Sequence, residues 1–116
     1  MNNVEELLQD FDRIIANAKH TIERVSEEKA EFKAHARSVT MGRLAAHCAT
    51  IPLFGVYILE EEGLDQANRQ RPRPDLTFNS RVECLKQLEE TSSKCRSSIA
   101  AASNDALDAK WCFRAG

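Results

Sequence analysis

The residue best suited to chemistry in this sequence is His47, which helical spacing places in the middle of a row of apolar side chains. At 100° per residue, Leu44, Ile51, Phe54 and Ile58 all fall within about 60° of it. A neutral imidazole is the commonest protein ligand for a metal ion, and the interiors of helical bundles are frequent metal sites. The same pattern is typical of a core histidine that hydrogen-bonds a backbone carbonyl, and either role predicts that this row and His47 face the bundle interior. The residues alone leave both hypotheses open.

Further metal ligands are hard to find near His47. A catalytic zinc site takes three protein ligands and a water. Cys48 points about 100° away from His47 on a helix, and His35 precedes the helix, so it approaches only if its loop folds inward. The acidic run from Glu60 to Glu62 indicates a solvated helix end. There is no HxxxH, HExxH or CxxC pair, no glycine-rich phosphate loop and no GxSxG motif.

The four cysteines are predicted to be reduced packing thiols rather than a reactive or metal-binding set. Cys84 and Cys95 share one predicted helix but lie about 16 Å apart along it, too far for a disulfide. The N-terminal residues are acidic and do not resemble a secretory signal. We therefore expect a cytoplasmic protein.

Composition excludes several classes of function. The chain of 116 residues is 42% hydrophobic, which predicts one globular domain spanning residues 1–116. Its net charge of −2 argues against a nucleic-acid partner. The only basic cluster is Arg69, Arg71 and Arg73, interpreted as an extended loop. The longest apolar run, Ile51 to Leu59, is much shorter than the roughly 18 residues of a membrane span, so we expect no membrane partner.

Three long helices are predicted to position these residues. The first spans about Val4 to Val25, the second starts at Ser38 or Thr40 and ends near Glu62, and the third starts at a capping box, Ser80 to Glu83. Pro52 should bend the second helix. The expected inner stripe of the first helix is Leu7, Phe11, Ile14, Ala18, Ile22 and Val25, widened by Val4, Leu8 and Ile15. That of the third is Leu85, Leu88, Ser92, Cys95, Ile99 and Ala102. Ser26 and Ser103 are candidate caps of two short turns.

The polar linker, residues 63–79, is long enough to return the chain to the end where the second helix began. The second and third helices should therefore run parallel, as in bundles with a crossover connection. Three helices and a short tail bearing Trp111 and Phe113 leave one groove uncovered. Either the tail covers it, or a second chain covers it as in a homodimer, or the sequence is a fragment.

The segments 23–29, 32–54 and 100–107, with Trp111 and the final Arg-Ala-Gly, closely resemble the DinB-like (YfiT-like) family of metalloproteins. The most specific match is the Leu-Ala-Ala-His stretch that ends at His47 and is followed by Ile-Pro and an aromatic residue. The resemblance implies an all-α four-helix bundle of up-down-down-up topology. It also implies a divalent metal, zinc or nickel, held by three histidines: His47 matches the first, and an HxxxH pair in the fourth helix supplies the others.

This sequence departs from the family pattern because it stops before the fourth helix and its HxxxH pair. We therefore expect three long helices, a short tail and an incomplete metal site with His47 as its one ligand. The resemblance implies a relative of metal-dependent transferases or hydrolases that act on small-molecule thiols, and it leaves enzymatic activity of this chain open. The alternative is a non-catalytic helical module that dimerises or binds a partner through the open groove.

Overall fold

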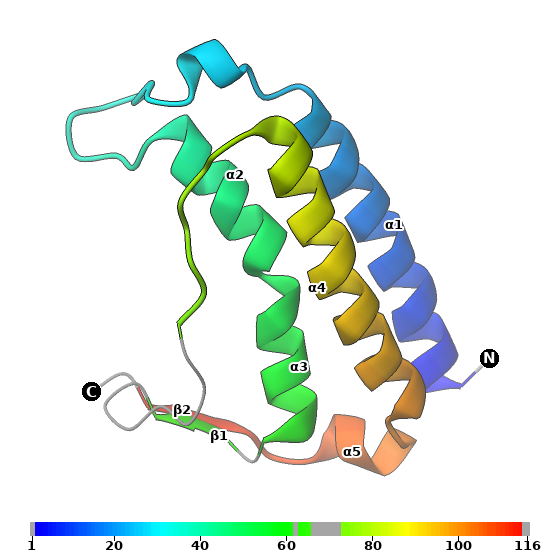
Figure 1. Ribbon diagram of the computed structural model, residues 1–116. Helices are drawn as coiled ribbons and strands as arrows, with labels where there is room; N and C mark the ends of the chain where they lie inside the picture. Colours follow the sequence, from blue (N-terminus) through cyan, green and yellow to red (C-terminus); the bar gives the residue numbers. More distant parts are fainter. Residues whose placement is uncertain (1, 62, 66–72, 115–116) are drawn as a thin grey trace.

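The protein is mostly helical, as the sequence predicts. The computed structural model describes residues 2–61, 63–65 and 73–114. Three rods lie side by side with α4 in the middle (Figure 1). The rods are α1 (Asn3–Glu23), the bent pair α2 (Met41–Thr50) and α3 (Pro52–Glu60), and α4 (Arg81–Ala101). The shorter elements are the 3-10 turn η1 (Glu27–Lys29), β1 (Gly63–Asp65), α5 (Asn104–Asp108) and β2 (Cys112–Arg114). Arg69, Arg71 and Glu62 lie outside the described residues.

Side-chain caps fix where the helices begin. The Ser80 hydroxyl accepts from Glu83 N (3.1 Å), which confirms the predicted start of α4. Thr40 caps α2 in the same way, and Ser103 caps α5, as predicted. Ser26 stands at the N-cap position of η1, as predicted, but its side chain makes no capping hydrogen bond.

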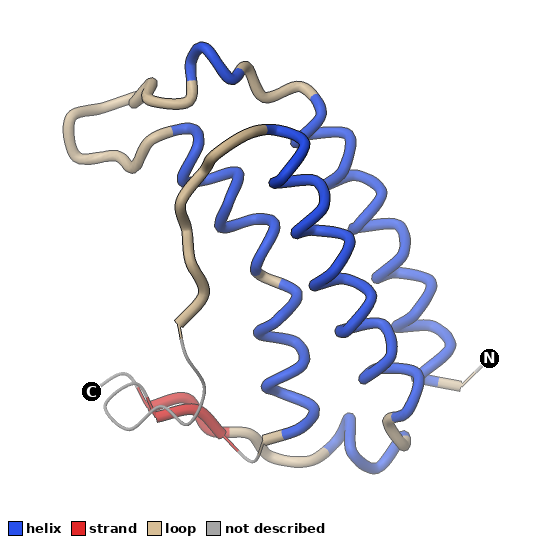
Figure 2. The backbone as a smooth tube through the Cα atoms, in the orientation of Figure 1, coloured by secondary structure: helices blue, strands red, loops and turns tan. Residues whose placement is uncertain are grey.

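Pro52 divides the second rod into two helices, as predicted (Figure 2). Because proline lacks an N–H, Cys48 O loses its helical donor. The ladder resumes with Phe54 N donating to Ile51 O (2.9 Å). At the break, the Thr91 hydroxyl of α4 donates to Ala49 O (2.6 Å), which ties the bend to the central helix.

The bent rod and α4 run parallel, and α1 runs antiparallel to them (Figure 1), which confirms the crossover predicted from the linker. The strands β1 and β2 pair in parallel, with Leu64 opposite Phe113. The sequence did not predict them, because three residues are too few to show an alternating pattern.

The core confirms the inner stripe of α4 and corrects that of α1. The α4 residues expected to face inward are buried or half-buried, and Leu88, Cys95 and Ile99 are at most 4% exposed. On α1, Ile22 is buried and Phe11, Ala18 and Val25 pack against the core, as predicted, but Leu7 and Ile14 are 38% and 55% exposed. Val4, Leu8 and Ile15, expected only to widen the stripe, pack against the core as well. The inner stripe of α1 is therefore the predicted one without Leu7 and Ile14, shifted toward the side of Leu8 and Ile15.

Candidate functional site

The apolar stripe expected to point inward on the second helix points outward instead. Leu44, Ile51, Phe54 and Ile58 are 53%, 52%, 40% and 40% exposed, and His47 among them is also exposed. These five residues are called the α2–α3 apolar face below. The prediction that His47 lies in the bundle interior was therefore wrong.

On α2, the physical reason is the small size of the residues on the opposite side, whereas α3 turns the large Val56 and Tyr57 toward the core. Ala45, Ala46 and Ala49 of α2 are at most 5% exposed and allow close packing. On α3, a Cβ built at Gly55 would lie only 2.6 Å from Cys95 Sγ of α4. Small side chains bring the helices close enough for dense contact. A pattern search that ranks residues by hydrophobicity favours the larger side chains and so selects the wrong face.

Two aromatic residues from the C-terminal part of the chain extend the α2–α3 apolar face. The ring of Phe54 makes edge contacts with Trp111 (centroids 5.6 Å apart) and Phe113 (6.3 Å). The Trp111 indole N–H donates to Glu61 O (3.0 Å), which holds this segment beside the end of α3. Trp111 and Phe113 of the tail therefore cover part of this face at its α3 end, which is one of the alternatives that the sequence left open. Leu44 and Ile51 remain about half exposed.

His47 is the one metal ligand that the sequence predicts, and the described residues do not complete a site around it. No group of three or more His, Cys, Asp or Glu side chains within residues 2–61, 63–65 and 73–114 is placed to hold a metal ion. His35 Nδ1 accepts from Arg37 N (3.1 Å) in its own exposed loop. His20 lies on α1, with Nδ1 3.9 Å from Glu23. One imidazole does not fit the three-nitrogen set that the resemblance implies.

The cysteines fall into two pairs of different exposure. All four are free; Cys84 and Cys95 are buried, whereas Cys48 and Cys112 are exposed. Burial raises the pKa of the Cys84 thiol, to which the nearby Cys48 adds, and burial alone raises the pKa of the Cys95 thiol. The expectation of packing thiols holds for the buried pair.

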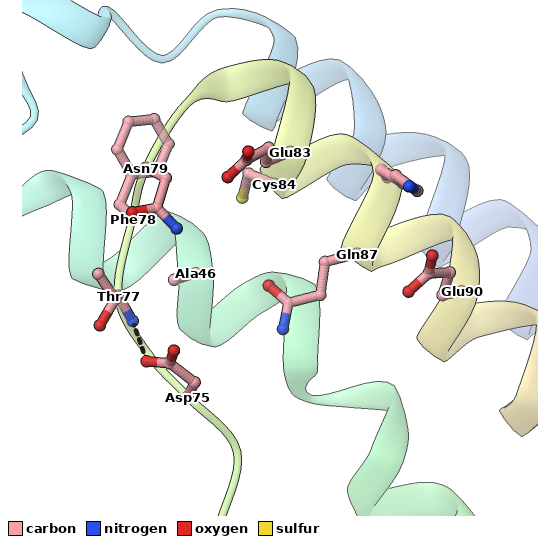
Figure 3. A pocket seen from close by; sticks show the side chains of 10 residues that line it. Ala46, Asp75, Thr77, Phe78, Asn79, Glu83, Cys84, Gln87 and Glu90 are labelled. Atoms are coloured by element: carbon pink, nitrogen blue, oxygen red, sulfur yellow. Dashed lines mark hydrogen bonds between the residues drawn. The ribbon is translucent and has the colours of Figure 1, made fainter.

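A second surface feature is a hollow of about 300 Å³ between α2, α4 and the segment 73–80 (Figure 3). Its floor includes Ala46 and Cys84, and its rim carries charged and amide side chains of α4 and the segment. Thr77 N donates to Asp75 Oδ1 (2.9 Å), and hydrogen bonding by Thr77 lowers the pKa of this carboxyl. No sequence pattern predicts this hollow, because its walls come from segments far apart in the chain.

The stretch Met41–Glu60 is long and apolar enough, by length and composition, to cross a membrane, and 44% of its most apolar window is buried. Core helices of water-soluble proteins satisfy the same criterion. Comparison of the chain with protein-family models, curated proteins and solved structures finds no match. The DinB-like resemblance therefore rests on the sequence alone.

Proposed function

We propose that this chain is a helical binding module that docks an apolar helix on the α2–α3 apolar face. The observation that carries the proposal is the exposure of four large apolar side chains in one row, at 40–53% each. Such rows are uncommon on monomers and are typical of interaction sites. Apolar residues at this helical spacing are also the usual anchors of helix-in-groove recognition.

The free energy available from burying this face indicates a reversible interaction. Full burial of one such side chain contributes about 2 kcal/mol, so burying the exposed half contributes about 1 kcal/mol. The four side chains together supply about 4 kcal/mol, which is at the low end of the cost of association. The adjacent Phe113, which is 48% exposed, adds to the anchor. We therefore expect a weak, concentration-dependent complex.

The environment-sensitive dye ANS tests the docking surface, because its fluorescence rises on exposed apolar patches. In dilute solution we expect Leu44→Gln to lower ANS fluorescence by about half. The matched control is Ile14→Gln, since Ile14 is similarly exposed but lies on α1. Circular dichroism shows whether each variant keeps its helices. Equal ANS fluorescence in the two variants would contradict the proposal.

The second candidate function is that of a DinB-like divalent-metal protein, a four-helix bundle when a further helix occupies the α2–α3 apolar face. The observation that favours it is the place of His47 within this face, three residues after Leu44 and four before Ile51. A helix docked there would bring its side chains beside the imidazole. His47 would then be one of several ligands of zinc or nickel, the others coming from outside the described residues. One imidazole supports no catalytic step by itself, so thiol transfer or hydrolysis stays an implication of the resemblance.

Equilibrium dialysis against Zn²⁺ or Ni²⁺ tests this second candidate. We expect metal bound by the wild-type chain to be lost in His47→Ala and kept in His20→Ala. His20 is a matched control because its side chain is 81% exposed on another helix. The same metal content in wild type and His47→Ala would remove His47 as a ligand.

A further inference from the structure

Two residues of the α2–α3 apolar face, Leu44 and Ile58, stand symmetrically about Ile51. Leu44 and Ile58 stand seven residues to either side, at about 10 Å along the helical rise. Two copies of this face placed antiparallel, with a two-fold axis at Ile51, would set Leu44 of each copy beside Ile58 of the other. We infer that the occupant of this face is a second copy of this chain in that arrangement. The inference rests on the proposed function of the face as a docking surface.

The distribution of charge along the rod selects the antiparallel arrangement. The exposed Arg43 stands at the α2 end, and Glu60 and Glu61 stand at the α3 end. A two-fold axis perpendicular to the rods sets the Arg43 end of each copy beside the acidic α3 end of the other. A parallel pairing would instead set basic end beside basic end and acidic end beside acidic end.

The helix ends favour the same arrangement. The N-terminus of α2 carries partial positive charge, and the C-terminus of α3 carries partial negative charge. Antiparallel packing sets each end against its opposite in the second copy. The bend at Pro52 adjoins the proposed axis, so α2 of one copy would follow α3 of the other. Such a contact is isologous and closes at two copies.

Disulfide trapping tests the register at the axis. Cys48 and Cys112 are exposed and are first replaced by serine, and Ile51→Cys is then introduced and oxidised with diamide. Facing residues at the axis of a close helix pair lie within disulfide range. We expect a covalent dimer with Ile51→Cys and none with the control Ile14→Cys, which is similarly exposed at 55% against 52%.

Sedimentation velocity on the wild-type chain provides the second measurement. We expect a mass that rises toward the dimer with concentration, a shift toward monomer in Leu44→Gln, and no shift in Ile14→Gln. A wild-type monomer without trapping at Ile51, or a dimer indifferent to Leu44→Gln, would overturn the second copy as occupant. If ANS fluorescence in dilute solution still depends on Leu44, the docking surface stands while this inference fails. If that dependence is also missing, both fail.

Discussion

The hydroxyl of Thr91 provides the sharpest test of how the bent rod is held. Thr91 is 5% exposed, and its Oγ1 donates to Ala49 O across the α2–α4 contact at 2.6 Å, with Leu88 O of its own helix at 3.2 Å. Ala49 is fully buried, so no water replaces this donor. Thr91→Val keeps the shape of the side chain and removes only the donor.

The expected cost of Thr91→Val is about 2 kcal/mol, because a buried carbonyl loses its partner. For a domain of this size, that corresponds to a fall in Tm of about 10 °C. Thr91→Ser keeps the hydroxyl and loses one methyl group, which costs about 1 kcal/mol. We therefore expect stability to fall in the order wild type, serine, valine, measured by thermal and urea unfolding followed by circular dichroism.

The neighbouring Ser92→Ala is the matched control, because the Ser92 hydroxyl donates within its own helix, to Glu89 O (3.1 Å), at a position that is only half-buried. Its cost should stay below about 0.5 kcal/mol. Two results would refute the reasoning: a valine variant as stable as wild type, or a serine variant less stable than the valine variant.

Three further predictions concern packing, charge and thiols. Gly55→Ala should destabilise the native chain, because the new Cβ would meet Cys95 Sγ at 2.6 Å. In a Cys95→Ala background, the same substitution should stabilise the chain by about 1 kcal/mol, because alanine has the higher helix propensity. Urea unfolding checks this change of sign. Hydrogen bonding by Arg96 (2.9 and 3.1 Å) lowers the pKa of Asp12, so this pair stabilises the fold at neutral pH and the stabilisation is lost as pH falls through the lowered pKa. The stability of Asp12→Asn, measured by urea unfolding, should therefore depend less on pH below 3.8 than that of the wild type. Ellman's reagent should react quickly with the exposed thiols of Cys48 and Cys112. It should react slowly with the buried thiols of Cys84 and Cys95 until urea unfolds the chain.

Much of the fold follows from local signals in the sequence. The bend at Pro52, the cap at Ser80 and the parallel course of the second and third rods were all predicted correctly, because each depends on a few neighbouring residues or on chain length. The inner stripe of α4 was also predicted, since its larger apolar residues, Leu88 and Ile99, are the ones it buries.

Which side of the bent rod faces the core could not be predicted in the same way. On α2, the large apolar Leu44 and the small alanines lie on opposite sides, and hydrophobicity alone favours burying the larger residue. The structure buries Ala45 and Ala49 instead, because closeness to α4 depends on the shape of both surfaces, whereas α3 buries the large Val56 and Tyr57. The residue pattern of one helix does not contain this information, because the fit depends on both helices. The contact of Phe54 with Trp111 was hidden for the same reason, since it joins residues 57 positions apart.

The outward place of His47 limits what can cover the α2–α3 apolar face. An imidazole sealed among apolar groups without a hydrogen bond costs about 1–3 kcal/mol, a large share of the roughly 4 kcal/mol that the four apolar side chains contribute. A helix that covers the whole face must therefore bring a polar group or a shared metal ion to this point.

In the antiparallel pair, His47 would lie about 6 Å from the two-fold axis and about 40° off the centre line, where it still reaches water at the rim. The two His47 rings would stand about 12 Å apart along the rod, too far to share one ion. The second copy and the metal site are therefore competing occupants of one face, and excess Zn²⁺ should leave the dimer unchanged if the second copy is correct. Dissociation by Zn²⁺ that depends on His47 would favour the metal site instead.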